Sequence, residues 1–366
     1  MLKTTIPFAE VRFFDDVPRR VELEQRFSKF LNKLRHAKVS LDTHSGSRID
    51  TEDGLEGLPC VLARNDRLKI SKRAAVYLNR VEGATGMQHL RDDDRKRLSS
   101  LRSGVVVSRV PTEHDADVLA SVLHDEMPWM APATEHIWHA LRKSVRGDQP
   151  GFQFAPLLLL GPPGIGKSHW ARRLGELLEV PTTVVDATGE PASFALVGSQ
   201  RGWSNAEPGK IIETIVAARC ANPIIVVDEV EKAGEVMSTN GSRFSLTDAL
   251  LPLLERMTAS TWQCPYYRIK CDMSWVGWVL TANSLEGLSE ALLSRCPPLD
   301  LPPISKAHLV AFARRQCQSR ELPDEAVDAI EEIVWMSRGD IGGPNLRTVK
   351  RMIDRAEITV RRPMLH

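Results

Sequence analysis

A short stretch near the middle of the chain restricts the possible folds more than any other feature. Four leucines, Leu157 to Leu160, are followed directly by the loop GPPGIGK, Gly161 to Lys167, and then by a helical pattern from Ser168 onward. A short, wholly apolar run bounded by a turn-forming loop is typical of a strand buried on both faces. Further apolar runs alternate with helical segments at Thr182–Ala187, Asn222–Glu229 and Ser274–Ser284. This alternation predicts an α/β fold with a parallel sheet covered by helices.

The patterns on either side of this region divide the chain into three expected domains. The N-terminal part contains one clear amphipathic pattern, from Pro18 to Ala37, and ends in a dense run of charges from Arg91 to Gly104. After the segment PPLDLPP the remaining patterns are helical. We therefore expect an N-terminal domain of unknown role over residues 1–105, the α/β domain over 106–303 and a small helical lid domain over 304–366.

Composition restricts the class of protein. The 366 residues are 42% hydrophobic and 26% charged, as is ordinary for a globular chain. No apolar run approaches the ~18 residues that a membrane span needs, and the N-terminal residues lack the pattern of an export signal. The 6 cysteines are scattered without CxxC spacing, which favours reduced thiols over disulfides or a zinc site. These features predict a cytoplasmic protein without a membrane segment.

Charge is unevenly distributed along the chain. Residues 1–105 contain 21 Lys and Arg against 15 Asp and Glu, whereas the remainder contains 27 against 32. A modest basic excess of this kind more often reflects a solvated surface than a nucleic-acid site. Nucleic acid is therefore a possible partner that the sequence does not favour.

The loop after the leucine run matches the phosphate-binding pattern G-x-x-x-x-G-K-[ST] in its required context, between a strand and a helix. Glycines allow backbone N–H groups to wrap phosphates, and the helix N-terminus adds a positive dipole end. We expect Lys167 to reach the β- and γ-phosphates of a nucleotide and Ser168 to ligate Mg²⁺. The expected nucleotide-binding residues of this segment are Gly161, Pro162, Pro163, Gly164, Ile165, Gly166, Lys167, Ser168 and His169.

A second motif ends another strand of the predicted sheet. The run PIIVVDE, Pro223 to Glu229, finishes in two carboxylates at what we expect to be the same carboxyl edge as the glycine-rich loop. In that position Asp228 is predicted to bind Mg²⁺ and to contact the nucleotide, and Glu229 to polarise the water that attacks the γ-phosphate. Taken alone, an Asp-Glu pair at a strand end is more often part of a solvated turn than of a functional site.

The order of the motifs then indicates a family. Strand, GPPGIGKS, helix, VVDEVEK, LTANS, LLSRC and a helical lid follow one another as in AAA+ ATPases, and the chain resembles in particular the ATPase module of Lon-type proteases. The segments GKIIETIVAARCANPIIVVDEVEKA and YYRIKCDMSWVGWVLTANS carry that second resemblance. It extends from Pro111 to Arg362 and leaves out the N-terminal part. It implies an ATP hydrolase that uses ATP and Mg²⁺ and assembles as a homo-oligomeric, hexameric ring.

The resemblance also implies roles for three further residues. Asn283 in LTANS matches the sensor-1 position, which orients the attacking water. Arg295 in LLSRC matches the arginine finger, which reaches the γ-phosphate held by a neighbouring subunit. The string PNLRTVKRMI resembles the sensor-2 region of enhancer-binding activators and points to Arg347, with Arg351 or no sensor 2 as alternatives.

Trp203 occupies an unusual place, within the polar segment VGSQRGWSNAEPGK and ahead of a Pro-Gly pair. At the same offset, AAA+ unfoldases of the Lon type have an aromatic residue on the loop that lines the central pore. The resemblance therefore implies that Trp203 grips an extended polypeptide. The alternative is that Trp203 packs against the core of its own chain or against a neighbour.

These observations lead to a preferred function and two rivals. The chain is expected to remodel or thread a protein substrate with the energy of ATP hydrolysis. Because the sequence ends at His366, soon after the lid, we expect no peptidase activity of the Lon kind. The rivals are a nucleic-acid machine of the initiator, loader or activator type and a nucleotide-dependent assembly switch.

Overall fold

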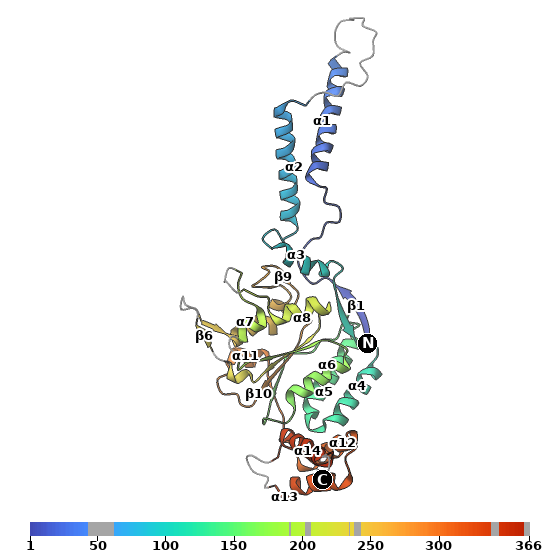
Figure 1. Ribbon diagram of the computed structural model, residues 1–366, viewed down its shortest axis with the longest axis vertical. Coiled ribbons are helices and arrows are strands. Elements are labelled where there is room, and N and C mark those ends of the chain that lie inside the picture. The colour runs from blue at the N-terminus through green and yellow to red at the C-terminus, as the bar shows by residue number, and fades with distance from the viewer. Residues whose placement is uncertain are drawn as a thin grey trace, which may run out of the picture. The chain divides into compact units, whose positions relative to one another are not determined.

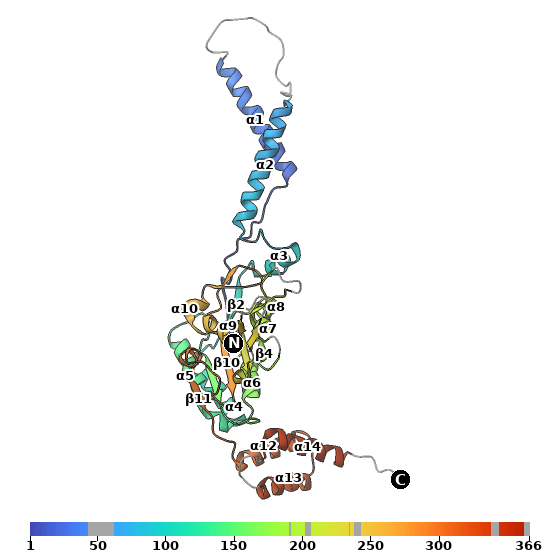
Figure 2. The same ribbon diagram turned by 90° about the vertical axis from the view of Figure 1, so that its left-hand side faces the viewer.

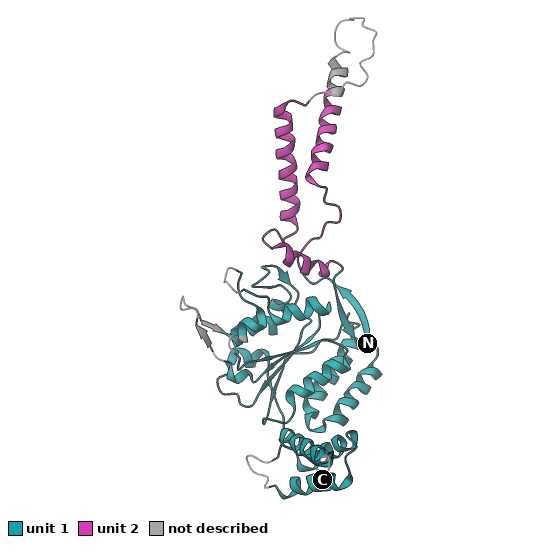
Figure 3. Ribbon diagram, viewed as in Figure 1, with its two compact units in different colours: residues 1–9, 103–366 teal, residues 10–102 magenta. Residues whose placement is uncertain are grey.

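The computed structural model describes residues 1–42, 62–189, 192–201, 206–233, 235–237, 243–337 and 344–361. The chain forms two compact units, coloured separately in Figure 3. The main unit comprises Met1–Ala9 and Ser103–His366, and the hairpin unit comprises Glu10–Arg102. The first domain expected from the sequence, residues 1–105, differs from the hairpin unit at both ends, because β1 (Leu2–Ile6) pairs antiparallel with β2 (Val105–Arg109) in the main unit.

A parallel sheet of five strands forms the centre of the main unit (Figure 1). Its order is β11-β3-β10-β5-β4, and every pairing is parallel. The predicted α/β fold class is thereby confirmed, and the apolar runs of the sequence supply these strands. They are β3 (Leu157–Leu160), β4 (Thr182–Asp186), β5 (Ile224–Asp228), β10 (Gly277–Ala282) and β11 (Pro298–Asp300).

Helices cover the sheet because its strands are apolar on both faces. Leu157 and Leu159 belong to a buried cluster with residues of α4, α5 and α6. Leu158, which lies between them and faces the other side of the sheet, is buried as well. Helix α4 has a side-chain cap at its N-terminus, because the Thr112 hydroxyl accepts a hydrogen bond from Asp115 N at 3.1 Å. Such a cap contributes about 1 kcal/mol. The helices of this α/β part are α4 (Glu113–Glu126), α5 (Ala131–Arg146), α6 (Lys167–Leu177), α7 (Ala192–Val197), α8 (Lys210–Ala218), α9 (Leu246–Leu254), α10 (Arg256–Ala259) and α11 (Glu290–Arg295).

Short elements complete this part of the chain. Besides the β1–β2 pair, two further antiparallel sheets of two strands lie outside the central sheet in the described ranges. They pair β6 (Glu235–Met237) with β7 (Arg243–Ser245) and β8 (Trp262–Gln263) with β9 (Lys270–Cys271). Two 3-10 turns, η2 (Pro128–Met130) and η3 (Val230–Lys232), also belong to it.

Three C-terminal helices form a lid with its own core (Figure 2). They are α12 (Lys306–Ser319), α13 (Asp324–Met336) and α14 (Leu346–Val360). The Arg315 guanidinium, on α12, donates hydrogen bonds to Asp125 O and Glu126 O at the end of α4, at 2.6 and 2.7 Å. A cation at a helix C-terminus is favourable because the last carbonyls carry partial negative charge. This contact joins the lid to α4, and the Leu346 N–H of the lid donates to Gly164 O of the glycine-rich loop at 3.2 Å. The lid core contains Leu309, Val310, Ala313, Cys317, Leu322, Ile330, Val334, Val349 and Ile353.

The hairpin unit contains two long helices, α1 (Arg20–Asp42) and α2 (Arg64–Ala84), followed by α3 (Asp92–Leu98) and η1 (Ser99–Leu101). The pattern predicted from Pro18 to Ala37 corresponds to α1, and the charged run forms α3. Side chains link the long helices: Arg20 donates to Ser71 Oγ at 2.7 Å, and Arg35 pairs with Asp66 at 2.8 Å. No helix within the described ranges is both long and apolar enough to cross a membrane.

The cysteines of the described ranges are free and buried. They are Cys220, Cys264, Cys271, Cys296 and Cys317. Burial raises the pKa of the Cys264 thiol to about 11. Cys60 lies outside the described residues.

Candidate active site

The glycine-rich loop connects β3 to α6 and adopts a conformation that glycine permits. Gly164 and Gly166 have φ values of +80° and +96°, in the left-handed region that side chains disfavour. A Cβ on Gly164 would also lie 2.9 Å from the Asn345 amide of the lid. The loop therefore needs glycine for its backbone and for the close approach of the lid, and it ends at the N-terminus of α6, where N–H groups are free to bind an anion.

Lys167, the first residue of α6, lies at the centre of the site. Its ammonium donates to Gly161 O at 2.6 Å, to Pro162 O at 3.2 Å and to Asn283 Oδ1 at 2.9 Å. Burial lowers the pKa of the Lys167 ammonium, while the charges of Glu231, Asp228 and Glu229 act in the opposite direction. Three nearby carboxylates thus favour the charged form of a desolvated lysine.

Ser168 and Asp228 provide the oxygen atoms expected for a metal-assisted phosphate site. Ser168 Oγ lies 2.9 Å from each carboxylate oxygen of Asp228, and the Thr281 hydroxyl donates to Asp228 Oδ1 at 2.5 Å. A hydroxyl beside a carboxylate is the hard donor set that Mg²⁺ prefers when it also binds nucleotide phosphates. These residues fit Mg²⁺, which when bound neutralises charge on the phosphates. No group of three or more His, Cys, Asp or Glu side chains in the described ranges forms another metal site.

Glu229 follows directly after β5 and has a left-handed backbone with φ of 55°. Its N–H donates to Thr281 Oγ1 at 3.1 Å, so one hydroxyl on β10 contacts both Asp228 and Glu229. The Glu229 carboxylate is bound on one side by Lys232 Nζ, 2.7 Å from Oε2, and faces Asn283 Nδ2 at 3.5 Å from Oε1. A half-exposed carboxylate in this position can accept a proton from a water molecule beside it.

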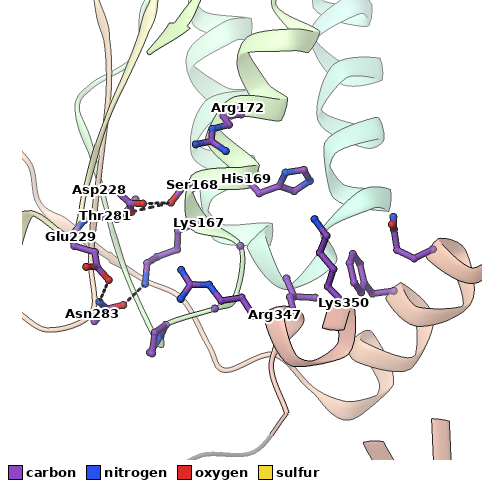
Figure 4. Close-up of a pocket in the computed structure, with 16 residues that line it drawn as sticks. Lys167, Ser168, His169, Arg172, Asp228, Glu229, Thr281, Asn283, Arg347 and Lys350 are labelled. Carbon is purple, nitrogen blue, oxygen red and sulfur yellow. Dashed lines mark hydrogen bonds between the residues drawn. The ribbon is translucent and has the colours of Figure 1, made fainter. Parts of the chain in front are cut away.

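The lid closes one side of a pocket of about 510 Å³. Arg347 and Lys350 of α14 line it, and in Figure 4 the Arg347 guanidinium points toward the same space as the Lys167 ammonium. Arg351 is not among the described residues that line the pocket. His169 and Arg172, one turn apart on α6, line it as well. The geometry thus places Arg347, rather than Arg351, beside the expected nucleotide.

The other predicted loop residues have different positions. Pro163, Gly164 and Gly166 line the pocket, whereas Gly161 and Pro162 contact Lys167 through their carbonyls. Ile165 is buried, and its carbonyl accepts a hydrogen bond from Trp129 Nε1 at 2.8 Å. Gly161, Pro162 and Ile165 therefore hold the loop in place through their backbone carbonyls and do not line the pocket.

Arg295 and Trp203 are not part of this pocket. Arg295 is the last residue of α11, and its guanidinium lies 3.4 Å from the Glu255 carboxylate and donates to Ala291 O. It is not among the described residues that line the pocket. Trp203 lies outside the described residues, so its expected role on a pore loop stays a prediction.

Several residues of the site were not predicted from the sequence. Thr281 lies on β10, two positions before Asn283, which directly follows the strand. This spacing was the available signal, because alternate residues of an extended segment share a face. Glu231 and Lys232 lie in η3, directly after the Asp-Glu pair, and no pattern indicates where that turn directs them. Lys350 and Arg172 reach the pocket one helical turn after Arg347 and Ser168, a spacing that places residues on one helix face.

Comparisons with known proteins agree with this geometry. Residues 157–299 match the model of the ATPase family associated with various cellular activities (AAA). The Lon protease of Paraburkholderia phytofirmans is 31% identical over 189 residues, which are 48% of this chain and 23% of that protein. Lon protease 2 of Bdellovibrio bacteriovorus is 24% identical over 379 residues, covering 89% of this chain and 44% of its own length. The Lon protease of Clostridium beijerinckii is 27% identical over 275 residues, which are 66% of this chain and 33% of that protein.

The chain thus spans less than half of the length of these three relatives. The matched segment begins with the first residue of β3 and extends to Leu299 in β11, so it contains the glycine-rich loop, the Asp-Glu pair, Asn283 and Arg295. The family match and the site agree on a nucleotide-binding, ATP-hydrolysing module. This chain therefore carries an AAA+ ATPase module similar to that of the Lon proteases.

Proposed function

We propose that this chain is a ring-forming ATPase that uses the hydrolysis of Mg²⁺-bound ATP to remodel or thread a protein substrate. Lys167 binds the phosphates, Ser168 and Asp228 hold the metal, Glu229 activates water, and Asn283 orients that water. Arg347 contacts the nucleotide from the lid. The observation that supports a ring is that Arg295 lies outside the nucleotide pocket of its own chain.

The position of Arg295 favours action on a neighbouring subunit. Within its own chain the guanidinium is bound to Glu255 and to Ala291 O, away from the lysine and carboxylates of the pocket. Phosphoryl transfer gains strongly from an arginine that neutralises charge developing on the transferred group. An arginine placed outside its own site performs this task when a second subunit presents it, and a closed ring gives each site one such neighbour.

A protein substrate is supported by the place of Trp203 in the sequence and by the similarity to Lon proteases over the ATPase module. An aromatic face binds extended polypeptide through apolar contact that does not depend on sequence. This property suits a machine that acts on unfolded segments.

Assembly and substrate response test the proposal together. Mass photometry with a slowly hydrolysed ATP analogue should show a closed oligomer, and reduced, carboxymethylated lactalbumin should stimulate ATP hydrolysis. A monomer at every nucleotide and protein concentration contradicts the ring. A ring that hydrolyses ATP at one rate with and without unfolded protein favours the assembly switch instead.

A further inference from the structure

Glu231 is a carboxylate of the site to which neither the sequence motifs nor the family match assigns a role. It lies in η3, the turn after β5, and its Oε1 accepts two hydrogen bonds from Asn283. The backbone N–H of Asn283 donates at 3.0 Å and its side-chain Nδ2 at 2.9 Å. We propose that Glu231 is a positioning residue for ATP hydrolysis, which acts by fixing the orientation of the Asn283 amide. This inference rests on the proposed function.

The orientation of an asparagine amide is decided by its hydrogen-bond partners. Asn283 Oδ1 accepts from the Lys167 ammonium at 2.9 Å, and Nδ2 donates to Glu231 Oε1 at 2.9 Å. An ammonium only donates and a carboxylate only accepts, so a flipped amide would face both partners with the wrong atom. Lys167 and Glu231 together permit a single orientation.

This orientation has a consequence for Glu229. Nδ2 has two hydrogens, and Glu231 binds one of them. The other lies on the side of Glu229, whose Oε1 is 3.5 Å away. A water molecule that contacts both the Glu229 carboxylate and the Asn283 amide would therefore meet an acceptor and a donor, which is the arrangement that activates and aims a nucleophile. Without Glu231, the amide would keep only the Lys167 contact at Oδ1 and the long contact with Glu229 at Nδ2.

One buried oxygen of the Glu231 carboxylate indicates that this residue does more than stabilise the fold. Its Oε2 is buried and has no hydrogen-bond partner within the described ranges. A buried acceptor without a partner destabilises the folded state, and a residue needed only to join β10 to η3 would avoid it.

A double-mutant cycle of Glu231 with Asn283 tests the inference. The kcat and KM for ATP are measured for the wild type, Glu231→Ala, Asn283→Ala and the double variant. Glu231→Ala should lower kcat by about 10- to 100-fold, the usual effect of removing a partner that orients a functional group, with KM within about threefold. Because Glu231 acts through Asn283, the same substitution in the Asn283→Ala background should change kcat by less than about threefold.

Further variants separate positioning from folding. Glu231→Gln keeps an oxygen that accepts from Asn283 and should retain more kcat than Glu231→Ala. Glu213→Ala, at an exposed glutamate in the first turn of α8, is the matched control and should behave as wild type. Thermal melts report the fold of each variant, and if Glu231→Ala melts far below wild type, the cycle is run with Glu231→Met, which removes the acceptor and keeps the length of the side chain.

Two results would overturn the inference while the proposed function stands. One is an equal loss of kcat from the Glu231 substitution in both backgrounds, and the other is an unchanged kcat in Glu231→Ala. A wild-type protein that binds ATP without hydrolysing it contradicts the proposed function itself, and the inference with it.

Discussion

Ser168 Oγ lies 2.9 Å from both carboxylate oxygens of Asp228, although 60 positions separate the two residues. The contact joins the start of α6 to the end of β5, so the phosphate-binding loop and the Asp-Glu pair form one site. The parallel sheet brings them together, because the carboxyl ends of neighbouring strands meet at one edge.

This contact predicts that a change at Asp228 weakens the affinity for Mg²⁺. Asp228→Asn removes the charge that would hold Mg²⁺ beside Ser168, so half-maximal ATP hydrolysis should need at least about tenfold more Mg²⁺. A Mg²⁺ titration of the ATPase rate measures this shift. Asp248→Asn, in the first turn of α9, serves as a control with an unchanged titration. An unshifted curve for Asp228→Asn would exclude Asp228 from metal binding.

The lid provides a matched pair of arginines on one helix. Arg347 lines the nucleotide pocket, and Arg351, one turn later, is not among its lining residues. Arg347→Ala should weaken the binding of a fluorescent ATP analogue about tenfold, as expected for the loss of a charged hydrogen bond, while Arg351→Ala should have little effect. Equal effects of both substitutions would show that neither contact is specific.

The Arg295 prediction concerns cooperation between subunits. Arg295→Ala should retain ATP binding and lose roughly 1,000-fold in hydrolysis, because the lost cation acts on the transferred phosphoryl group. Mixed into wild-type rings, the variant should lower activity more than dilution alone. The measurement is the ATPase rate across a series of mixing ratios, with mixed rings verified by mass photometry. A loss that is merely proportional to the mixed fraction argues that each subunit works alone.

Trp203 allows a test of the threading hypothesis. If the side chain grips substrate, Trp203→Ala should leave assembly and basal ATP hydrolysis near wild type and abolish stimulation by unfolded protein. Trp203→Tyr should restore part of that stimulation, because an aromatic face remains. A tryptophan packed in the core behaves differently, since its truncation costs about 3 to 5 kcal/mol and lowers the melting temperature. A strongly lowered melt, or an unchanged response to substrate, would remove Trp203 from the mechanism.

The sequence predicts those parts of the fold and site that depend on local pattern and strand order. The leucine run and the glycine loop predict β3 and the start of α6. Placement of Asp228 and Asn283 at one edge follows from a parallel sheet.

Other parts depend on contacts between distant segments. The pairing of β1 with β2 joins residues about a hundred positions apart, and no local pattern indicates it. The approach of Arg347 and Lys350 depends on how the lid packs, through contacts such as Arg315 with the end of α4. Glu231 reaches Asn283 only because Glu229 adopts a left-handed backbone before the η3 turn, and an L residue in that conformation is not predictable from its identity.

The most direct test of the account is the behaviour of Glu229→Gln. Glutamine keeps the shape of the side chain but does not accept a proton, so the variant should bind ATP with near wild-type affinity and hydrolyse it at least about 100-fold more slowly. Lys167→Ala is the companion variant, and it should fail at the binding step. Binding and phosphate release are measured on the same preparations, with thermal melts to verify the fold. Tight ATP binding with slow hydrolysis in Glu229→Gln is the predicted result, and normal turnover in that variant would contradict the proposed chemistry of the site.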